Sequence, residues 1–508
     1  MKTRIQQLQT ALQSGLIERE TPARLALLAA LSGEHLLLIG APGTAKSALA
    51  RRLHLVFDHG QYFERLLTRF SVPEELFGPL SIKALEDDRY ERLTQAYLPD
   101  ASIAFIDEIF KANSAILNAL LTILNEREFD NGSRRIKIPL VAVIAASNEL
   151  PEGDELDALY DRFLLRYHVE PISPEGFNQL LMLENIEIPV IDPQWKLTRD
   201  DLQQIQTQSA QVLLDDDVHY LLSQLREHLT AQNHYVSDRR WRKLVKLLKV
   251  AAWTDGRTTV DVWDCWLLQH CLWHLPEQRA DLLQWYEKSL GADAIINPAR
   301  LTRLADAWEN TLNNEQGSHR QLHDENGHPL YLDTEGELTL RSGHQEELTI
   351  NGEPLYLAPP DQADRTNNGK GYQQKELASL FFDDHYQQCH IDGKWVSLAQ
   401  YTADPENRLT RDIHYPPHAE PVYFSQTHVA ERVQEVQVIL DAIKRYEQAV
   451  NEKLSTLKAD ISQRLWVEKA FVTPAHDNLQ QSLHVIQTLA GRIEKLRVGF
   501  SQLPVKQA

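Results

Sequence analysis

The chain has 508 residues, of which 43% are hydrophobic and 24% are charged. This balance is typical of a soluble globular protein of about three domains, and it excludes a disordered, collagen-like or purely coiled-coil chain. Lysine and arginine number 52 against 72 aspartates and glutamates, a formal net charge of −20. A sequence-independent nucleic-acid binder must neutralise phosphates, so this excess of negative charge argues against that class.

Cysteine content and hydropathy indicate the compartment. Three cysteines exclude a disulfide framework and predict a reducing environment. The longest apolar runs fall far short of the roughly 18 residues that span a bilayer. Residues 1–13 also lack the apolar core of a signal peptide. We therefore expect a cytoplasmic protein without a transmembrane segment.

Residues 1–170 alternate short apolar runs with amphipathic segments, the pattern of an α/β domain with a parallel sheet between helices. Thr21 and Pro22 are typical of the N-cap and first turn of a helix. Five strands are expected, at His35–Ile39, Tyr62–Leu66, Ile103–Ile106, Leu140–Ala146 and Phe163–Val169.

A glycine-rich loop follows the first of these strands and precedes a helix. Its backbone N–H groups and the helix N-terminus then face a bound phosphate. Lys46 would reach the β- and γ-phosphates, and Ser47 would ligate Mg²⁺. Ala45 stands where a glycine is usual, and its methyl group is tolerated only at right-handed backbone angles. Ile17 is a candidate wall for the adenine. The loop consists of Gly40, Ala41, Pro42, Gly43, Thr44, Ala45, Lys46 and Ser47.

Polar side chains also follow two later strands. Asp107 and Glu108 end a buried strand at the sheet edge where ligands bind. Asp107 would hold the Mg²⁺ shell, and Glu108 would activate the attacking water. Asn148, at the tip of the next strand, could hold the same water. These residues and the loop together predict a site for ATP and Mg²⁺.

Two arginine positions complete the candidate site. Arg162 precedes the fifth strand and could be an arginine finger that enters a neighbouring subunit's site. Arg239 begins a helix after Ser237 and could contact the γ-phosphate of its own chain, with Arg240 as the rival. Surface salt bridges and a plain helix cap are the simpler interpretations.

A hairpin is expected at 128–138, turned by Asn131 and Gly132, which would present Arg134, Arg135 and Lys137 to a central pore. A metal cluster at Cys265, His270, Cys271 and His274 is less favoured than a packed helix, because the two cysteines do not share a face.

The rest of the chain divides by composition. Residues 1–170 form the nucleotide-binding core, and 171–297 read as a helical subdomain. Residues 319–424 carry glycines and prolines between short apolar pieces, which predicts a β-rich module. Heptad-like spacing around it, at 298–318 and 425–508, predicts a discontinuous helical bundle into which this module is inserted.

These motifs resemble the AAA+ ATPases, and among them the MoxR family. Three segments resemble the helix-2 insert of that group, namely Thr68–Pro79, which opens it, and Arg89–Leu93 and Ala96–Pro99, which close it. Further similar segments are Asp107–Ala112, Leu124–Phe129, Tyr160–Arg162 and Val236–Trp241. The motifs cover roughly the first 275 residues, and beyond them only the layout is similar.

The resemblance implies a Mg²⁺-dependent ATP hydrolase that forms a hexamer and acts with a cytoplasmic partner carrying a von Willebrand A domain, through which it could contact a membrane. It implies chaperone-like maturation of metalloproteins and respiratory complexes. One member of the family is linked to an inducible lysine decarboxylase through a module placed like 319–424. Two alternatives are a nucleic-acid motor with the same insert and a nucleotide-gated scaffold with little turnover.

Overall fold

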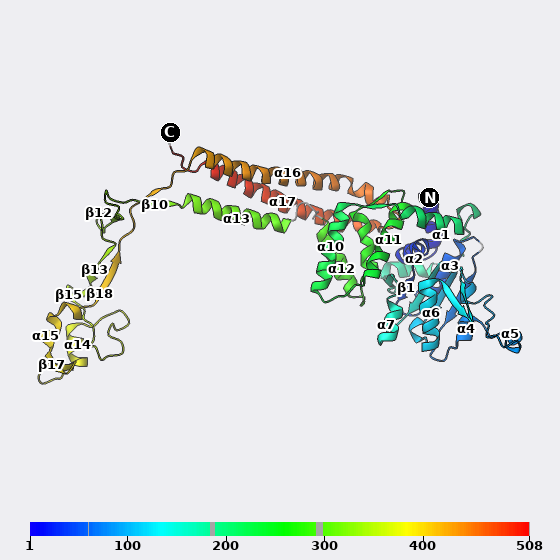
Figure 1. The fold of residues 1–508 in the computed structure, drawn as a ribbon, viewed down its shortest axis with the longest axis horizontal. Coiled ribbons are helices and arrows are strands. Elements are labelled where there is room, and N and C mark those ends of the chain that lie inside the picture. Colours follow the sequence, from blue (N-terminus) through cyan, green and yellow to red (C-terminus); the bar gives the residue numbers. More distant parts are fainter. Residues whose placement is uncertain (59, 183–187, 291–297, 507–508) are drawn as a thin grey trace. The chain divides into compact units, whose positions relative to one another are not determined.

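The computed structural model describes residues 1–58, 60–182, 188–290 and 298–506. The chain folds into two compact units (Figure 1, where colours follow the sequence). Unit 1 comprises 1–305 and 439–493, and unit 2 comprises 306–438 and 494–508. These borders fall inside the three longest helices, whereas composition places borders at helix ends.

Unit 1 contains a parallel five-stranded sheet in the order β2-β3-β6-β1-β7. Three of its strands are buried on both faces for most of their length, as expected between two layers of helices. The register pairs Leu36 with Ile144 on one side and with Leu165 on the other. The strands are β1 (Leu36–Ile39), β2 (Tyr62–Leu66), β3 (Ile103–Asp107), β6 (Ala142–Ser147) and β7 (Leu165–His168).

The strands differ from expectation only at their ends, for reasons of hydrogen bonding. His35 precedes β1, where its Nδ1 accepts the Val143 N–H at 2.9 Å. Phe163 and Leu164 precede β7, and their carbonyl oxygens accept from an arginine side chain. The first core helix was expected to open at Thr21, but it begins at Glu20. The Thr21 hydroxyl donates to Glu468 at 3.0 Å instead of capping the helix.

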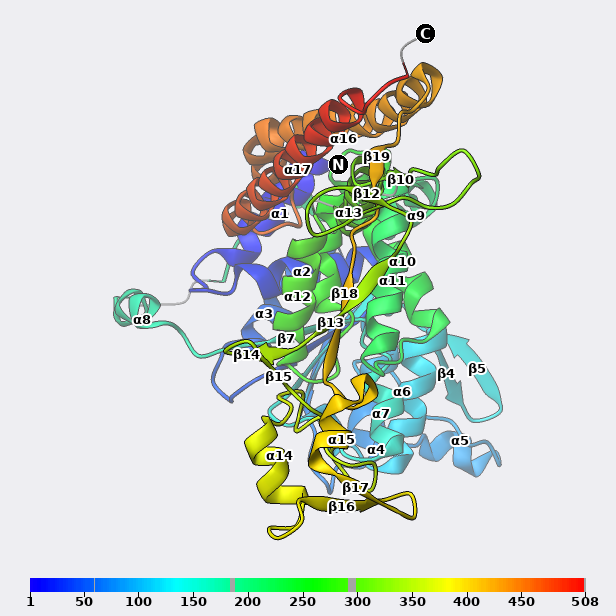
Figure 2. The same cartoon turned by 90° about the vertical axis from the view of Figure 1, so that its left-hand side faces the viewer.

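Helices cover both faces of this sheet. A small insert after β2 contains two one-turn helices, and it packs on the β4–β5 hairpin, which Figure 2 shows beside α6. The elements are α1 (Lys2–Gln13), α2 (Glu20–Ser32), α3 (Lys46–Leu55), α4 (Pro73–Phe77), α5 (Ile82–Glu86), η1 (Leu98–Asp100), η2 (Ile109–Lys111), α6 (Ser114–Glu126), β4 (Glu128–Asn131), β5 (Arg134–Lys137) and α7 (Asp154–Tyr160).

The region after the sheet is a helical lid, as composition indicates. The cysteine and histidine segment forms a 3₁₀ helix rather than a face of an α-helix, and Cys265, His270 and Cys271 are fully buried. Among the described residues no cluster is suited to hold a metal ion. The elements are α8 (Pro174–Leu181), η3 (Pro193–Trp195), α9 (Arg199–Ser209), β8 (Leu213–Leu214), α10 (Asp216–Ala231), α11 (Asp238–Thr254), β9 (Thr259–Val260), η4 (Val262–His270) and α12 (Gln278–Ser289).

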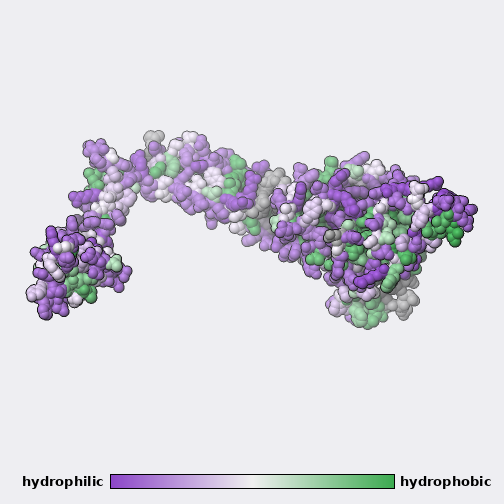
Figure 3. Space-filling view, turned by 60° about the horizontal axis from the view of Figure 1, so that its bottom comes forward, coloured by the Kyte–Doolittle hydropathy of each residue, from purple (hydrophilic) through white to green (hydrophobic). Residues whose placement is uncertain are grey.

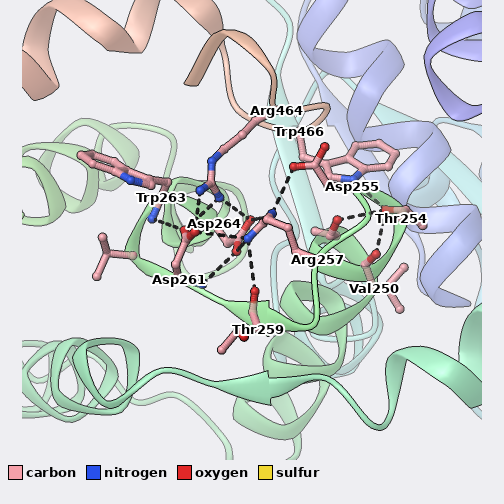
Figure 4. A network of polar contacts seen from close by, with 12 residues as sticks. Val250, Thr254, Asp255, Arg257, Thr259, Asp261, Trp263, Asp264, Arg464 and Trp466 are labelled. Atoms are coloured by element: carbon pink, nitrogen blue, oxygen red, sulfur yellow. Dashed lines mark hydrogen bonds and ion pairs between the residues drawn. The ribbon is translucent and has the colours of Figure 1, made fainter. Parts of the chain in front are cut away.

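The turn between α16 (Gln426–Ser462) and α17 (Val472–Ser501) is bound to this lid by a buried ionic network (Figure 4). Arg464, with only 8% of its side chain exposed, contacts Asp261 at 2.8 Å and Asp264 at 3.3 Å. Arg257 donates to the other oxygen of Asp264 at 2.7 Å. Beside them, the Trp466 indole donates to the Thr254 hydroxyl at 2.9 Å. The turn is therefore an integral part of unit 1.

Unit 2 combines helix ends with short antiparallel strand pairs. Trp308 on α13 (Pro298–Gln316) packs edge-on against Phe500 on α17. A small core forms around Tyr356, Leu377 and Tyr401. The remaining elements are β10 (His319–Gln321), β11 (Tyr331–Leu332), β12 (Leu338–Thr339), β13 (Gly343–Glu347), β14 (Thr349–Ile350), β15 (Glu353–Pro354), α14 (Gln374–Phe381), β16 (Gln388–Ile391), β17 (Lys394–Ser397), α15 (Leu398–Ala403), η5 (Pro405–Asn407), β18 (Thr410–His414), β19 (Ala419–Pro421) and η6 (Lys469–Phe471), the last of which belongs to unit 1.

The visible face in Figure 3 is mostly hydrophilic, with apolar side chains gathered in small separate patches. Within the described ranges, no helix combines the length and apolar character that a membrane crossing requires.

Candidate functional site

The glycine-rich loop lies between β1 and α3, at the carboxyl edge of the sheet. The Lys46 ammonium donates to the carbonyl oxygens of Gly40 at 2.7 Å and Ala41 at 2.8 Å, so it points into the loop. A side chain at Gly40 would place its Cβ 2.3 Å from the Val169 carbonyl oxygen, so the end of β7 requires glycine there. Gly43 has open space but a φ of +81°, which a glycine adopts without strain. The loop thus keeps a backbone that depends on glycine at Gly40 and Gly43, with the Lys46 ammonium held inside it.

Ala45 departs from its expected geometry. It adopts φ 64° and ψ 22°, the left-handed region, at the N-cap of α3. The sequence-based condition that its angles stay right-handed is wrong, because the loop holds Ala45 in the conformation that a glycine there would adopt. The methyl group is accommodated at the expense of backbone strain.

Asp107 and Glu108 lie close to Lys46 across the carboxyl edge. Burial lowers the pKa of Lys46, and the negative charges of Asp107 and Glu108 act in the opposite direction. Glu108 also has a positive φ of 53° and forms an ion pair with Lys111 at 3.3 Å. The Glu108 N–H donates to Asp107 Oδ1 at 3.1 Å, which helps to fix the Asp107 carboxylate.

Asn148 follows β6, the strand between β1 and β3, so it lies at the same edge as Lys46 and Asp107. Its side chain is exposed, as a water-holding amide would be. Ile17 is partly buried in the turn before α2. Its contact with an adenine stays a prediction.

Sequence analysis missed Arg19, whose side chain connects the phosphate loop with the segment that follows β7. Its Nε donates to the Thr44 carbonyl oxygen at 3.1 Å, and its Nη2 donates to the Glu170 carbonyl oxygen at 3.0 Å. The side chain is 7% exposed. A lone arginine before a helix carries no sequence signal for this role, because its partners are backbone atoms far along the chain.

Arg162 and Arg239 lie together, but at the opposite edge of the sheet. Arg162 comes just before β7, at the amino edge, about 13 Å of strand away from the loop. Arg239 donates to Asp161 at 3.4 Å and to Asn125, near the end of α6, at 3.2 Å. Lys46 lies at the other edge of the sheet, and contact between Arg239 and a γ-phosphate of its own chain stays a prediction.

The two lid arginines differ sharply in exposure. The Arg239 side chain is 41% exposed, whereas that of Arg240 is 5% exposed and bonded to carbonyl oxygens. Burial lowers the pKa of Arg162, and the nearby Arg239 lowers it further. Arg239 is therefore the arginine available to a ligand, beside Arg162.

The β4–β5 hairpin is turned by Gly132 and Ser133, one residue later than expected, because Asn131 pairs with Arg134. A Cβ at Gly132 would lie 1.8 Å from the Tyr90 carbonyl oxygen, so the hairpin tip fits closely on the insert. Arg135 is neutralised by three carboxylates, those of Glu126, Glu128 and Asp130. Arg134 and Lys137 are exposed.

Comparisons with known proteins place the first half of the chain in a known family. A family model described as the MoxR domain in the MoxR-vWA-beta-propeller ternary systems matches residues 3–207, and an AAA lid domain model matches 217–286. Two uncharacterized proteins of Methanocaldococcus jannaschii are each 42% identical, over 53% and 54% of this chain and 70% and 72% of their own lengths. The chaperone MoxR1 of Mycobacterium tuberculosis is 28% identical over 41% of this chain and 52% of its own length.

The sheet order, the loop after β1 and the helical lid define an α/β protein of the AAA+ class. Within that class, the chain belongs to the MoxR family of AAA+ ATPases.

Proposed function

We propose that this protein hydrolyses ATP with Mg²⁺ and uses the energy to remodel other proteins. The observation that carries the proposal is the position of Lys46 beside Asp107 and Glu108 at one edge of the sheet. Lys46 would bind the phosphates, and Ser47 with Asp107 would hold Mg²⁺, which neutralises phosphate charge when bound. Glu108 would take the proton of the attacking water, with Asn148 orienting that water.

The opposite edge supports a ring in which each site is shared. Arg162 and Arg239 both contact Asp161 at the amino edge, whereas the loop lies at the carboxyl edge, and their side chains are 21% and 41% exposed. In a homo-hexamer this edge of one subunit would face the loop of the next. Both arginines would then stabilise the charge of the neighbour's γ-phosphate during transfer.

Partners follow from the family rather than from the geometry. A von Willebrand A-domain protein is the proposed partner, since the matching family model is described from systems that contain one. The specific proposal is a RavA-type chaperone ATPase of the cytoplasm with a ViaA-like partner, acting on respiratory or metal-containing complexes. The β-rich module at 319–424, with its own small core, would bind a further partner such as a lysine decarboxylase.

Phosphate release with and without Mg²⁺ tests the proposal in three proteins. Wild type should turn over ATP, and Glu108→Gln should bind ATP without turnover. Lys46→Gln should lose binding, because the loop loses its cation. Wild-type protein without Mg²⁺-dependent turnover would overturn the proposal, and strong stimulation by polynucleotides would favour a nucleic-acid motor instead.

A further inference from the structure

Two buried arginines hold the backbone around Arg162. We call residues 160–164, which lead from α7 to β7, the finger loop. Arg240 comes from the lid and Arg166 from β7, and their side chains are 5% and 0% exposed. Both donate to carbonyl oxygens of the finger loop, so each restrains the backbone instead of pairing only with a side chain.

Arg240 makes most of these bonds. Its Nη1 donates to the carbonyl oxygen of Asp161 at 3.2 Å, and its Nη2 donates to those of Phe163 at 3.1 Å and Leu164 at 2.9 Å. The same Nη1 reaches the Asp161 carboxylate at 3.2 Å. These hydrogen bonds restrain the backbone on both sides of Arg162. Five N–H donors in a rigid plane suit arginine to this task, and lysine cannot reproduce the set.

The same side chains bind the finger loop to the lid. Arg240 Nε donates to the Cys271 carbonyl oxygen at 2.7 Å, and the Tyr160 hydroxyl donates to the His274 carbonyl oxygen at 2.7 Å. Arg166 joins the carbonyl oxygens of Tyr160 and Trp273. Three side chains thus connect the finger loop with residues 271–274 of the lid.

Arg162 itself has weak side-chain restraints. Its closest carboxylate oxygen, on Asp161, is 3.9 Å away, and among the described residues its buried Nε has no hydrogen-bond partner. The direction of Arg162 therefore depends on its backbone. Backbone bonds within the chain, such as that from the Arg162 N–H to the Leu159 carbonyl oxygen at 3.0 Å, fix its N–H groups, and Arg240 fixes the carbonyl oxygens on both sides of it.

We propose that Arg240 is a positioning residue for Arg162: it fixes the finger loop on the lid so that Arg162 meets the neighbouring subunit's nucleotide. This inference rests on the proposed function, since Arg162 serves a reaction only if neighbours share their sites. A displacement of about 1 Å at such a group lowers turnover roughly 100-fold. Arg240 acts on the neighbour's site, while its own subunit's phosphate loop remains intact.

Subunit mixing separates this role from a general role in folding. Full-length Arg240→Lys alone should bind ATP as wild type does and turn over roughly 100-fold more slowly. Glu108→Gln subunits are inactive at their own site but keep an undisturbed Arg162. In mixed rings the Arg240→Lys subunits should regain turnover, because their intact loop then meets a working arginine.

Arg162→Ala mixed with Glu108→Gln reports on the proposed function itself. Rescue of both Arg162→Ala and Arg240→Lys supports the inference. Rescue of Arg162→Ala alone would place the effect of Arg240 within its own subunit and overturn the positioning role. If neither is rescued in rings shown to be mixed, the shared site fails and the inference falls with it.

Two further variants serve as a control and as a substitute for Arg240→Lys. Arg242→Lys, an exposed arginine on the same helix, should leave turnover unchanged. Asp161→Asn removes the carboxylate that contacts Arg162, Arg239 and Arg240, and its side chain is 35% exposed, so the fold should tolerate it. If Arg240→Lys is insoluble, Asp161→Asn replaces it in the mixing experiment. Asp161→Asn subunits that do not regain turnover when mixed with Glu108→Gln subunits would then count against the inference.

Discussion

Two residues at the carboxyl edge adopt backbone angles that disfavour their side chains. Ala45 has a φ of 64° and Glu108 a φ of 53°. The left-handed region costs about 1–2 kcal/mol for a residue with a Cβ. Such conformations persist where the surrounding structure fixes them, and they occur at functional sites. Ala45 precedes Lys46, the residue proposed to bind the phosphates, and Glu108 is the residue proposed to activate the attacking water.

Ala45→Gly should relieve this strain. We expect the free energy of unfolding to rise by about 1 kcal/mol, since the glycine's greater entropy in the unfolded chain offsets part of the gain. Urea unfolding followed by circular dichroism measures it. Ala48→Gly, in right-handed backbone on the same helix, is the control and should destabilise by about 1 kcal/mol. Equal losses at both positions would show that Ala45 is unstrained.

The positions of several site residues were predictable from local motifs, whereas their roles stay predictions. Asp107 ends β3, Glu108 follows it, and Lys46 opens α3 after the loop that follows β1, so a strand–loop–helix pattern and a strand end bring them to one edge. Arg19 and Arg240 act on carbonyl oxygens of distant segments, and no spacing encodes such partners. The surroundings of Arg239 were likewise not predictable, because the packing of the lid decides which edge of the sheet it approaches.

At the scale of elements, the α16–α17 turn depends on buried charge. Asp264 is 2% exposed, and burial raises its pKa while Arg257 and Arg464 oppose the shift. Removing one partner from such a cluster leaves a charge both buried and incompletely paired. The turn carrying Arg464 is thereby coupled to the lid segment that contains Asp261.

Arg464→Met should destabilise unit 1 by about 2–4 kcal/mol, because Asp261 loses its shortest contacts and Asp264 keeps only Arg257. The shift in urea unfolding measures this loss. Lys453→Met is the matched control, since Lys453 pairs with Asp217 at 3.1 Å near the surface and should cost less than about 1 kcal/mol. Equal small effects would mean that the network does not hold the turn.

Elements were predictable to within a few residues, and the errors have a common cause. The strand centres follow from apolar runs, whereas the ends depend on partners. Residues 163–164 are apolar yet lie outside β7, because an arginine from the lid occupies their carbonyl oxygens. The hairpin turn shifted by one residue for the same kind of reason, through the pairing of Asn131 with Arg134.

At the scale of the whole molecule, the two halves of the candidate site lie at opposite edges of one sheet. Lys46, Asp107 and Glu108 occupy the carboxyl edge, and Arg162 with Arg239 occupies the amino edge. In the proposed ring, the amino edge of one subunit would meet the carboxyl edge of the next. Under this proposal, ATP hydrolysis requires a neighbouring subunit.

The most direct test is ATP turnover per subunit across a series of protein concentrations. Loss of an arginine finger lowers phosphoryl transfer by on the order of 10³ to 10⁵ in rate. Turnover per subunit should therefore rise steeply as wild-type rings form, in step with assembly measured by light scattering. Arg162→Ala should assemble and bind ATP yet stay slow at every concentration. Wild-type turnover that is independent of concentration, or full activity in Arg162→Ala, would contradict the shared site.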